Sequence, residues 1–249
     1  MEYVEILRAR RVLTWYCAIL LGMLAISVIS LYSGHHPNIY GGHGSLAVSA
    51  ILTGCAFGAM IVATCVAPGL NAESNTLAIA WTRPIPRASI VLRYIAVDVV
   101  AIIVAYAYTF AIVLAFCALL GFAGHIFVDA DIPLALLNGL GCALMWYGLI
   151  MVVAAPLNGR GALIAGLSWG AFVVIGVLWS APFPTAIHAV LTFLNYFNPL
   201  TYFAGENSDG HAHGHEVLML SPEILTLIAW GFVAVTLAGT VRLWSTREV

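Results

Sequence analysis

The most chemically suggestive side chains of this sequence are three alternating histidines near its C-terminus. His211, His213 and His215 lie between Asp209 and Glu216 in a stretch that also contains glycine. Imidazole and carboxylate groups at such close spacing can wrap a zinc or copper ion. The same composition is typical of a solvated loop whose histidines titrate near neutral pH. We interpret the run as a solvated loop and keep zinc or copper binding as the alternative.

A second pattern, Gly166-Leu-Ser168-Trp-Gly170, matches the nucleophile elbow of serine hydrolases, and His188 follows it in the sequence. Such a serine must lie on a sharp strand-to-helix turn, within hydrogen-bonding reach of a histidine. Here the serine lies inside an apolar run of helical length, and His188 lies beyond the end of that run. Small residues four apart are typical of closely packed membrane helices. We therefore predict that Ser168 packs within a helix, and we assign the chain no catalytic residue.

Asp98 is the clearest carboxylate close to or within an apolar run. Acidic side chains inside a membrane often belong to ion or proton routes. Asp98 follows Arg93 by only five residues, near the start of its run. We predict that Asp98 snorkels toward Arg93 or the membrane interface. Two amides near the opposite side, Asn138 and Asn195, could contact a substrate.

The overall composition places these side chains in a membrane protein. Of the 249 residues, 62% are hydrophobic and 8% are charged, and the mean hydropathy is +1.01. A soluble domain is about half apolar and about a quarter charged. The sequence contains no lysine and no basic tract with interleaved aromatic residues, so nucleic acid is excluded as an expected partner.

Apolar runs predict the membrane-spanning helices, since about 20 such residues cross the hydrocarbon core. The runs that reach this quality fall at residues 14–32, 46–70, 91–123, 132–156, 161–180 and 222–244. A shorter stretch, 186–194, predicts a re-entrant or interfacial helix within an outer loop at 181–221. Residues 1–13 mix charged and apolar side chains and predict an amphipathic helix at the membrane surface. We expect one all-α transmembrane domain over residues 1–249, with six spans.

The arginines predict the orientation of these spans. All nine basic residues are arginines, and each falls at an end of the chain or in a loop on the same predicted side. They are Arg8, Arg10, Arg11, Arg83, Arg87, Arg93, Arg160, Arg242 and Arg247. Because arginine is enriched in cytoplasmic loops, we predict a multi-pass protein of the cytoplasmic membrane with both termini in the cytoplasm.

The longest polar interruption on that side is the segment 71–93, between the second and third spans. Its polar start carries residues that cap helices, including Asn75 after Glu73. Two prolines at 84 and 86 then force an extended turn, because a residue before proline avoids the helical region. We predict a short helix, a stiff turn and a new helix that leads into the third span, and we call residues 71–90 the coupling segment.

The same segment resembles the coupling region of permeases of the type-2 ABC exporter family. In that family a Glu begins a short cytoplasmic helix, and a Thr-Leu pair, a Ser/Thr-x-Pro-Ile/Val-x-Arg turn and a basic residue follow. The corresponding residues here are Glu73, Thr76-Leu77, Thr82-Arg83-Pro84-Ile85-Pro86-Arg87 and Arg93. The chain departs from the family at Asn75, where glycine is common, and at Arg93, where lysine is common.

The resemblance also covers the topology of nearly the whole chain and implies partners. Such permeases pair as dimers and sit on two ATP-binding-cassette subunits, made as separate chains, which bind ATP and magnesium. The residues implied in contact with that ATPase are Glu73, Thr76, Leu77, Arg83, Pro84 and Arg87. Those implied at an outer gate, after the re-entrant helix, are Asn195, Asn198, Pro199 and Tyr202. An internal phosphate loop requires a lysine, and the sequence has none, so we expect this chain to bind no nucleotide cofactor itself.

The function implied is therefore that of the transmembrane subunit of an ATP-driven exporter. Spans without charges deep inside them suit a hydrophobic or amphiphilic substrate, such as a lipid, a drug or a peptide. The alternative is a polytopic membrane protein without an ATPase partner, either a secondary carrier or a metal-handling membrane component. A membrane enzyme is the third alternative.

Overall fold

Long helices account for almost all of the protein in its computed structural model. The structure describes residues 2–32, 46–67, 86–119, 121–154, 161–179, 184–199 and 221–246, and about 91% of these are helical. In chain order the elements are α1 (Glu2–Tyr32), β1 (Leu46–Ala47), α2 (Val48–Val66), α5 (Arg87–Leu119), η2 (Phe122–His125), β2 (Ile126–Phe127), α6 (Ile132–Ala154), α7 (Gly161–Trp179), α8 (Thr185–Asn195) and α10 (Pro222–Thr246). The expected α-helical membrane fold is confirmed at this level.

Five of the described helices, α1, α2, α5, α6 and α10, are long and apolar enough to cross a membrane. The expected span at 161–180 is helix α7, but its apolar part, Leu163–Leu178, is shorter than these five. The stretch 186–194 is helical as expected and forms most of α8. The chain is therefore a membrane-embedded helical protein, whereas the count of six spans and the re-entrant position of α8 stay predictions.

Helix α1 is one unbroken helix of 31 residues. The sequence suggested a surface helix at 1–13 followed by a span at 14–32, but the structure has no break between them. The reason is local, since no proline and only one glycine, Gly22, occurs between Glu2 and Tyr32. Any tilt of the first turns toward the membrane surface must therefore involve the whole helix.

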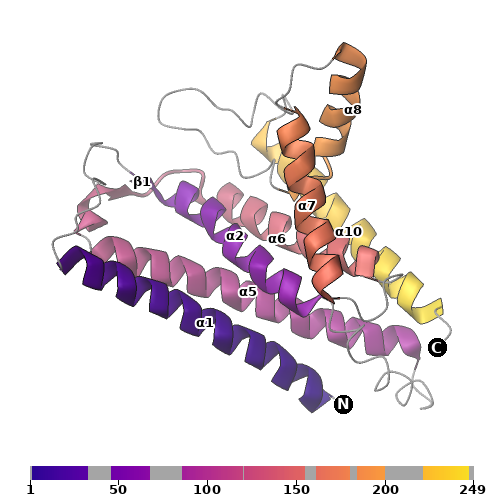
Figure 1. The fold of residues 1–249 in the computed structure, drawn as a ribbon, viewed down its shortest axis with the longest axis horizontal. Coiled ribbons are helices and arrows are strands. Elements are labelled where there is room, and N and C mark those ends of the chain that lie inside the picture. The colour runs from indigo at the N-terminus through magenta and orange to yellow at the C-terminus, as the bar shows by residue number, and fades with distance from the viewer. Residues whose placement is uncertain are drawn as a thin grey trace.

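Helix α6 forms the centre of the bundle. It packs against α2 and α10, while α5 packs against α2 and α1. Of the residues in the membrane-crossing part of α6, 61% are buried, against 6% for α1. Figure 1 shows α1 running beside α5 along one edge of the bundle. Most of the surface of α1 is therefore available to contact lipid or another protein.

The described arginines gather at one end of the bundle, which we call the arginine end. Arg8, Arg10 and Arg11 belong to the first turns of α1, Arg87 and Arg93 to the first turns of α5, and Arg242 to the end of α10. The two termini lie toward this end, and β1 lies at the opposite one (Figure 1). The structure thus agrees with a one-sided distribution of arginine. That the arginine end faces the cytoplasm stays a prediction.

A short parallel pairing of β1 with β2 departs from the purely helical expectation. Leu46 pairs with Ile126, and Ala47 pairs with Phe127. Beside it, the backbone N–H of Ser49 donates to Asp129 Oδ1 over 3.2 Å, so a carboxylate from the loop before α6 caps the start of α2. The hydrogen bonds from Ser49 lower the pKa of Asp129. These contacts join α2 and α6 at the end opposite the arginines.

Glycines on α2 and α6 allow other helices to approach closely. A side chain at Gly58 would collide with the Tyr16 hydroxyl of α1, and one at Gly148 would collide with Thr236 of α10. By contrast, Gly166 and Gly170 of α7 face open space. Helices therefore pack closely at Gly58 and Gly148, whereas the glycine pair on α7 has no packing role among the described residues.

We predict that Gly148→Ala destabilises the protein and that Gly166→Ala does not. A Cβ atom at position 148 would lie 2.9 Å from Thr236 Cβ, so α6 and α10 must separate, at a cost of about 1–3 kcal/mol. At position 166 the new methyl group meets nothing within 4 Å. Unfolding of the purified protein by heat or by added denaturing detergent measures both variants, and equal stability of the two would contradict the packing described.

Candidate functional site

A buried ion pair connects α1 and α5 near the arginine end. Arg8 Nη2 donates to Asp98 Oδ1 over 2.6 Å, and the side chains are 17% and 1% exposed. A charge-assisted hydrogen bond of this length is short and directional. Because the surroundings have a low dielectric constant, the attraction is much stronger here than in water. The pair fixes the height of α1 relative to α5.

Two tyrosines complete what we call the Asp98 cluster, which consists of Arg8, Tyr94, Asp98 and Tyr147. Tyr147 Oη of α6 donates to Asp98 Oδ2 over 3.0 Å, so both carboxylate oxygens accept a hydrogen bond. The guanidinium carbon of Arg8 lies 5.4 Å from the ring centroid of Tyr94, which is within the range of a cation–π contact. Three helices, α1, α5 and α6, therefore meet at one carboxylate.

The cluster leaves part of the guanidinium of Arg8 unused. Nε and Nη1 of Arg8 are buried and have no hydrogen-bond partner in the part of the chain that the structure describes. Desolvation offsets much of the attraction within a buried ion pair, so its net contribution to stability is small. Loss of one partner is costly, however, because it leaves the other charge buried alone. We interpret the cluster as a device that fixes helix positions.

This arrangement corrects the expectation for Asp98. The sequence predicted that Asp98 would snorkel toward Arg93 or the interface, but its carboxylate is buried against α1 and α6. Snorkelling is unnecessary because a cation from another helix reaches the carboxylate inside the bundle. Arg8 and Tyr147 are the functional candidates that sequence reasoning missed. Their one available signal was position, since Arg8 and Asp98 both belong to helix segments predicted near the same membrane surface.

The predicted coupling residues are only partly within the structure. Arg87 is exposed and is the first residue of α5, where Pro86 O accepts hydrogen bonds from the backbone N–H groups of Ser89 and Ile90. A helix that begins immediately after the prolines agrees with the predicted restart. The other predicted contacts lie outside the described residues; they are Glu73, Thr76, Leu77, Arg83 and Pro84.

The outer residues form a small polar group at the end of α8. Asn195 and Asn198 are 2% and 3% exposed, and Asn198 Nδ2 donates to Asn195 Oδ1 over 3.3 Å. Pro199 follows and is also buried, while Tyr202 lies outside the described residues. The structure therefore brings Asn195 and Asn198 together, and their role at an outer gate stays a prediction. Asn138, the other amide singled out, is half-buried on α6.

A hydroxyl group on α2 joins three helices through two tryptophans. Thr64 Oγ1 accepts the indole N–H of Trp146 from α6 over 2.9 Å and that of Trp169 from α7 over 3.1 Å. The same hydroxyl donates to Met60 O over 2.9 Å. The two indole rings lie 4.6 Å apart, and Phe57 meets Trp169 edge-to-face. This polar contact attaches α7, which is otherwise mostly exposed, to the centre of the bundle.

The nucleophile-elbow pattern lies within helix α7 and not on a strand-to-helix turn. Ser168 is 7% exposed, and its Oγ donates to Ile164 O over 2.8 Å. The prediction that Ser168 packs inside a helix is confirmed. His188 belongs to α8.

The metal alternative concerns His211, His213 and His215, which lie in the range 200–220, outside the described residues. Within the described ranges, no group of three or more His, Cys, Asp or Glu side chains could hold a metal ion. The histidine cluster therefore stays a sequence-based hypothesis.

Comparison of the chain with protein-family models, with curated proteins and with solved structures finds no match.

We predict that Asp98→Asn lowers the free energy of unfolding by about 3–5 kcal/mol, since it leaves the charge of Arg8 buried without a counter-ion. Arg8→Met should cost a similar amount. The double variant Arg8→Met/Asp98→Asn should cost much less than the sum, because removing both charges abolishes the penalty that each single change creates. Denaturant unfolding of all three proteins measures this coupling, and strictly additive effects would refute the ion pair.

We predict that Thr64→Val destabilises the protein, whereas Thr64→Ser does not. Valine has the shape of threonine but accepts no hydrogen bond, so two indole N–H groups lose their acceptor, at roughly 1–3 kcal/mol each. Serine keeps the hydroxyl. Thermal unfolding, followed by tryptophan fluorescence, compares the variants, and equal behaviour of valine and serine would show that Thr64 is not the acceptor.

Proposed function

We propose that this protein is the transmembrane subunit of an ATP-binding-cassette exporter in the cytoplasmic membrane, and that a separate subunit hydrolyses the ATP. In this proposal the arginine end faces the cytoplasm, α7 is the sixth span, α8 is a re-entrant helix, and two copies or paralogues form the transport route. The observation that carries the proposal is the junction at Arg87. There the coupling segment passes directly into a 33-residue helix, α5.

Helix α5 is suited to transmit a movement of that segment. It is longer than the hydrocarbon core requires, at about 50 Å for its 33 residues, and it contains no proline or glycine. Asp98 lies 11 residues after Arg87, which is about 16 Å along the helix axis. A push on the start of α5 would therefore displace Asp98.

The Asp98 cluster would distribute this displacement. Asp98 holds Arg8 of α1 through one carboxylate oxygen and Tyr147 of α6 through the other. Helix α6 in turn packs against α2 and α10. A rigid movement of α5 would thus move α1 and α6 with it, because the hydrogen bonds at Asp98 connect the three helices directly. This supports a chain that receives force from a partner.

Helix α8 and the residues that follow it supply the proposed outer gate. Asn195 and Asn198 lie at the end of α8, bonded to each other, and α8 packs against α7. Helix α7 is attached to the centre through Trp169 and Thr64. A change in the position of α2 would therefore reach α8 by way of α7, and residues 182–202 would open or close in response.

The substrate we propose is hydrophobic or amphiphilic. Asp98 is the charged residue that is fully buried among the described parts of the helices, and Arg8 neutralises it. A small hydrophilic ion would need unpaired polar groups along its route. The apolar character of the helices instead suits a lipid, a drug or a peptide.

We predict that the purified protein co-isolates with an ATPase, encoded for example in a neighbouring reading frame, and that Arg87→Gln uncouples the two. Transport-dependent ATP hydrolysis should fall severalfold, because the start of α5 loses a contact with the partner. Thermal unfolding of the variant measures separately any loss of stability within the chain. Arg242→Gln is the matched control, since Arg242 is also exposed at the arginine end but lies on α10. Glu73→Gln should behave like Arg87→Gln.

Two results would contradict this proposal. The first is the absence of any nucleotide-binding partner after gentle purification. The second is equal ATP hydrolysis and transport in the Arg87 and Arg242 variants, since a general effect of surface charge would then explain any loss.

A further inference from the structure

The guanidinium of Arg8 holds Asp98 by only one of its nitrogens. Nη2 donates to Oδ1 over 2.6 Å, whereas Nε and Nη1 are buried without a hydrogen-bond partner in the described part of the chain. Arginine frequently holds a carboxylate as a planar fork, with two parallel bonds to its two oxygens. The ring of Tyr94 attracts the charge of Arg8, but an aromatic face accepts a hydrogen bond only weakly. The ion pair therefore lacks a bond that its chemistry allows.

Tyr147 occupies the oxygen that a fork would need. Its hydroxyl donates to Asp98 Oδ2 over 3.0 Å, and Tyr147 and Asp98 are 0% and 1% exposed. Because both side chains are shielded from bulk water, donors from α1 and α6 share the one carboxylate of α5. In the described arrangement the tyrosine has its acceptor, while two nitrogens of Arg8 have none.

A second arrangement leaves the same number of buried donor groups unpaired. If Arg8 turned a fork to both oxygens of Asp98, one more of its nitrogens would be bonded, and the hydroxyl of Tyr147 would lose its acceptor. One nitrogen and one hydroxyl would then be unpaired, in place of the two nitrogens that are unpaired now. Unpaired buried donors are the costly feature of either arrangement. We therefore expect the two arrangements to be close in free energy.

Helix α5 has little contact with α6 besides this hydrogen bond. It packs mainly against α2 and α1, whereas α6 packs mainly against α2 and α10. The hydroxyl of Tyr147 adds a polar link to the small contact between α5 and α6. Loss of that link would let α5 shift near Asp98, while α6 stays held in the centre of the bundle.

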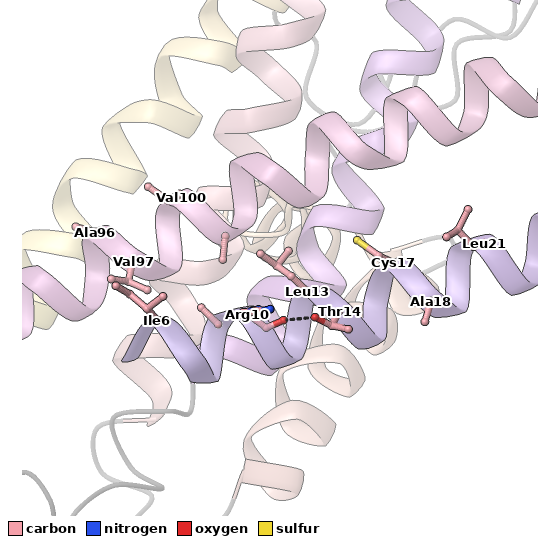
Figure 2. Close-up of a pocket in the computed structure, with 12 residues that line it drawn as sticks. Ile6, Arg10, Leu13, Thr14, Cys17, Ala18, Leu21, Ala96, Val97 and Val100 are labelled. Carbon is pink, nitrogen blue, oxygen red and sulfur yellow. Dashed lines mark hydrogen bonds between the residues drawn. The ribbon is translucent and has the colours of Figure 1, made fainter. Parts of the chain in front are cut away.

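Helix α1 would shift together with α5, because the two are joined at more than one level. Tyr16 Oη and Thr109 Oγ1 share a buried hydrogen bond of 2.6 Å, and Thr109 lies 11 residues beyond Asp98, about 16 Å along α5. Figure 2 shows α1 and α5 side by side along this seam, with Ile6 close to Val97. The two helices thus form one unit, which the Asp98 cluster connects to α6.

We infer that Asp98 is a two-state latch between α5 and α6. In the first state, which the structure describes, Arg8 and Tyr147 share the carboxylate and join α1, α5 and α6. In the second state Arg8 takes both oxygens as a fork, Tyr147 is released, and α1 and α5 shift together relative to α6. The latch goes beyond the proposed function, since it belongs to this chain alone and needs no ATPase partner. In an exporter it would decide whether a push on α5 reaches α6.

Double electron–electron resonance on the purified full-length protein tests the latch. Spin labels at Leu92 of α5 and Val153 of α6 report on the joint that opens, and labels at Leu7 of α1 and Leu92 report on the joint that stays closed. All three side chains are exposed. The labels are attached to genetically encoded keto amino acids, so the five native cysteines stay in place. We expect a short and a less populated long distance between α5 and α6, and one distance between α1 and α5.

Two variants should shift the latch in opposite directions. Tyr147→Phe removes the competing hydroxyl and should raise the ratio of long to short distances between α5 and α6 about tenfold, the change expected for one hydrogen bond to a charged group. Arg8→Lys keeps the positive charge but forms no fork, so the long distance should disappear. Tyr106→Phe is the matched control, since it removes another buried hydroxyl of α5, which donates to Leu52 O over 2.7 Å, and it should leave the ratio unchanged.

Three results would overturn the inference. They are a single distance between α5 and α6 that Tyr147→Phe does not change, an equal effect of the Tyr147 and Tyr106 variants, and a long distance that persists in Arg8→Lys. The first result would mean that the cluster only fixes helix positions. Thermal unfolding of each variant verifies that the helices remain packed. These measurements use the chain without an ATPase, so their outcome is independent of the tests of the proposed function.

Discussion

The position of the helices in this protein depends on one buried carboxylate. A charge inside a membrane is costly unless another group compensates it, and Asp98 is 1% exposed. The compensation comes from Arg8 on α1 and Tyr147 on α6. Any arrangement that separates α1 or α6 from α5 would remove one of the two hydrogen bonds that this carboxylate accepts. Three of the long helices are therefore held at one relative height by a single side chain.

The rest of the bundle is joined by contacts that work without a hydrophobic driving force. Lipid tails are as apolar as leucine, so membrane helices associate through close packing and interhelical hydrogen bonds. Both occur here. At Gly58 and Gly148 the missing side chain lets Tyr16 and Thr236 of neighbouring helices pack close to the backbone. The Thr64 hydroxyl accepts hydrogen bonds from tryptophans of two other helices. The centre is thus close-packed, whereas α1 and α7 contribute large exposed apolar surfaces.

These constraints give the proposed exporter a mechanical path. Force applied at Arg87 would enter a long helix without proline or glycine and reach α1 and α6 at Asp98. The force would then act on one joint, where α1 meets α5.

The sequence by itself determined the class of the protein and the location of its helices. Apolar runs long enough to cross a bilayer predict helices because unpaired backbone groups are too costly in lipid, and the described helices fall close to the predicted runs. Local signals also placed the start of α5 beside Pro86 and the helix that contains Ser168. These features depend only on neighbouring residues and on the surrounding solvent.

Only the tertiary structure decided which side chains meet. Nothing in the local sequence distinguishes Arg8, which is buried and paired with Asp98, from Arg10, which is exposed. The two differ in which face of α1 they occupy and in what packs there. The prediction for Asp98 was wrong because its partner, Arg8, lies 90 residues away in the chain. No local pattern around Asp98 reveals that pairing. Contacts of this kind are set by the mutual rotation and height of whole helices, and these depend on the packing of all the helices at once.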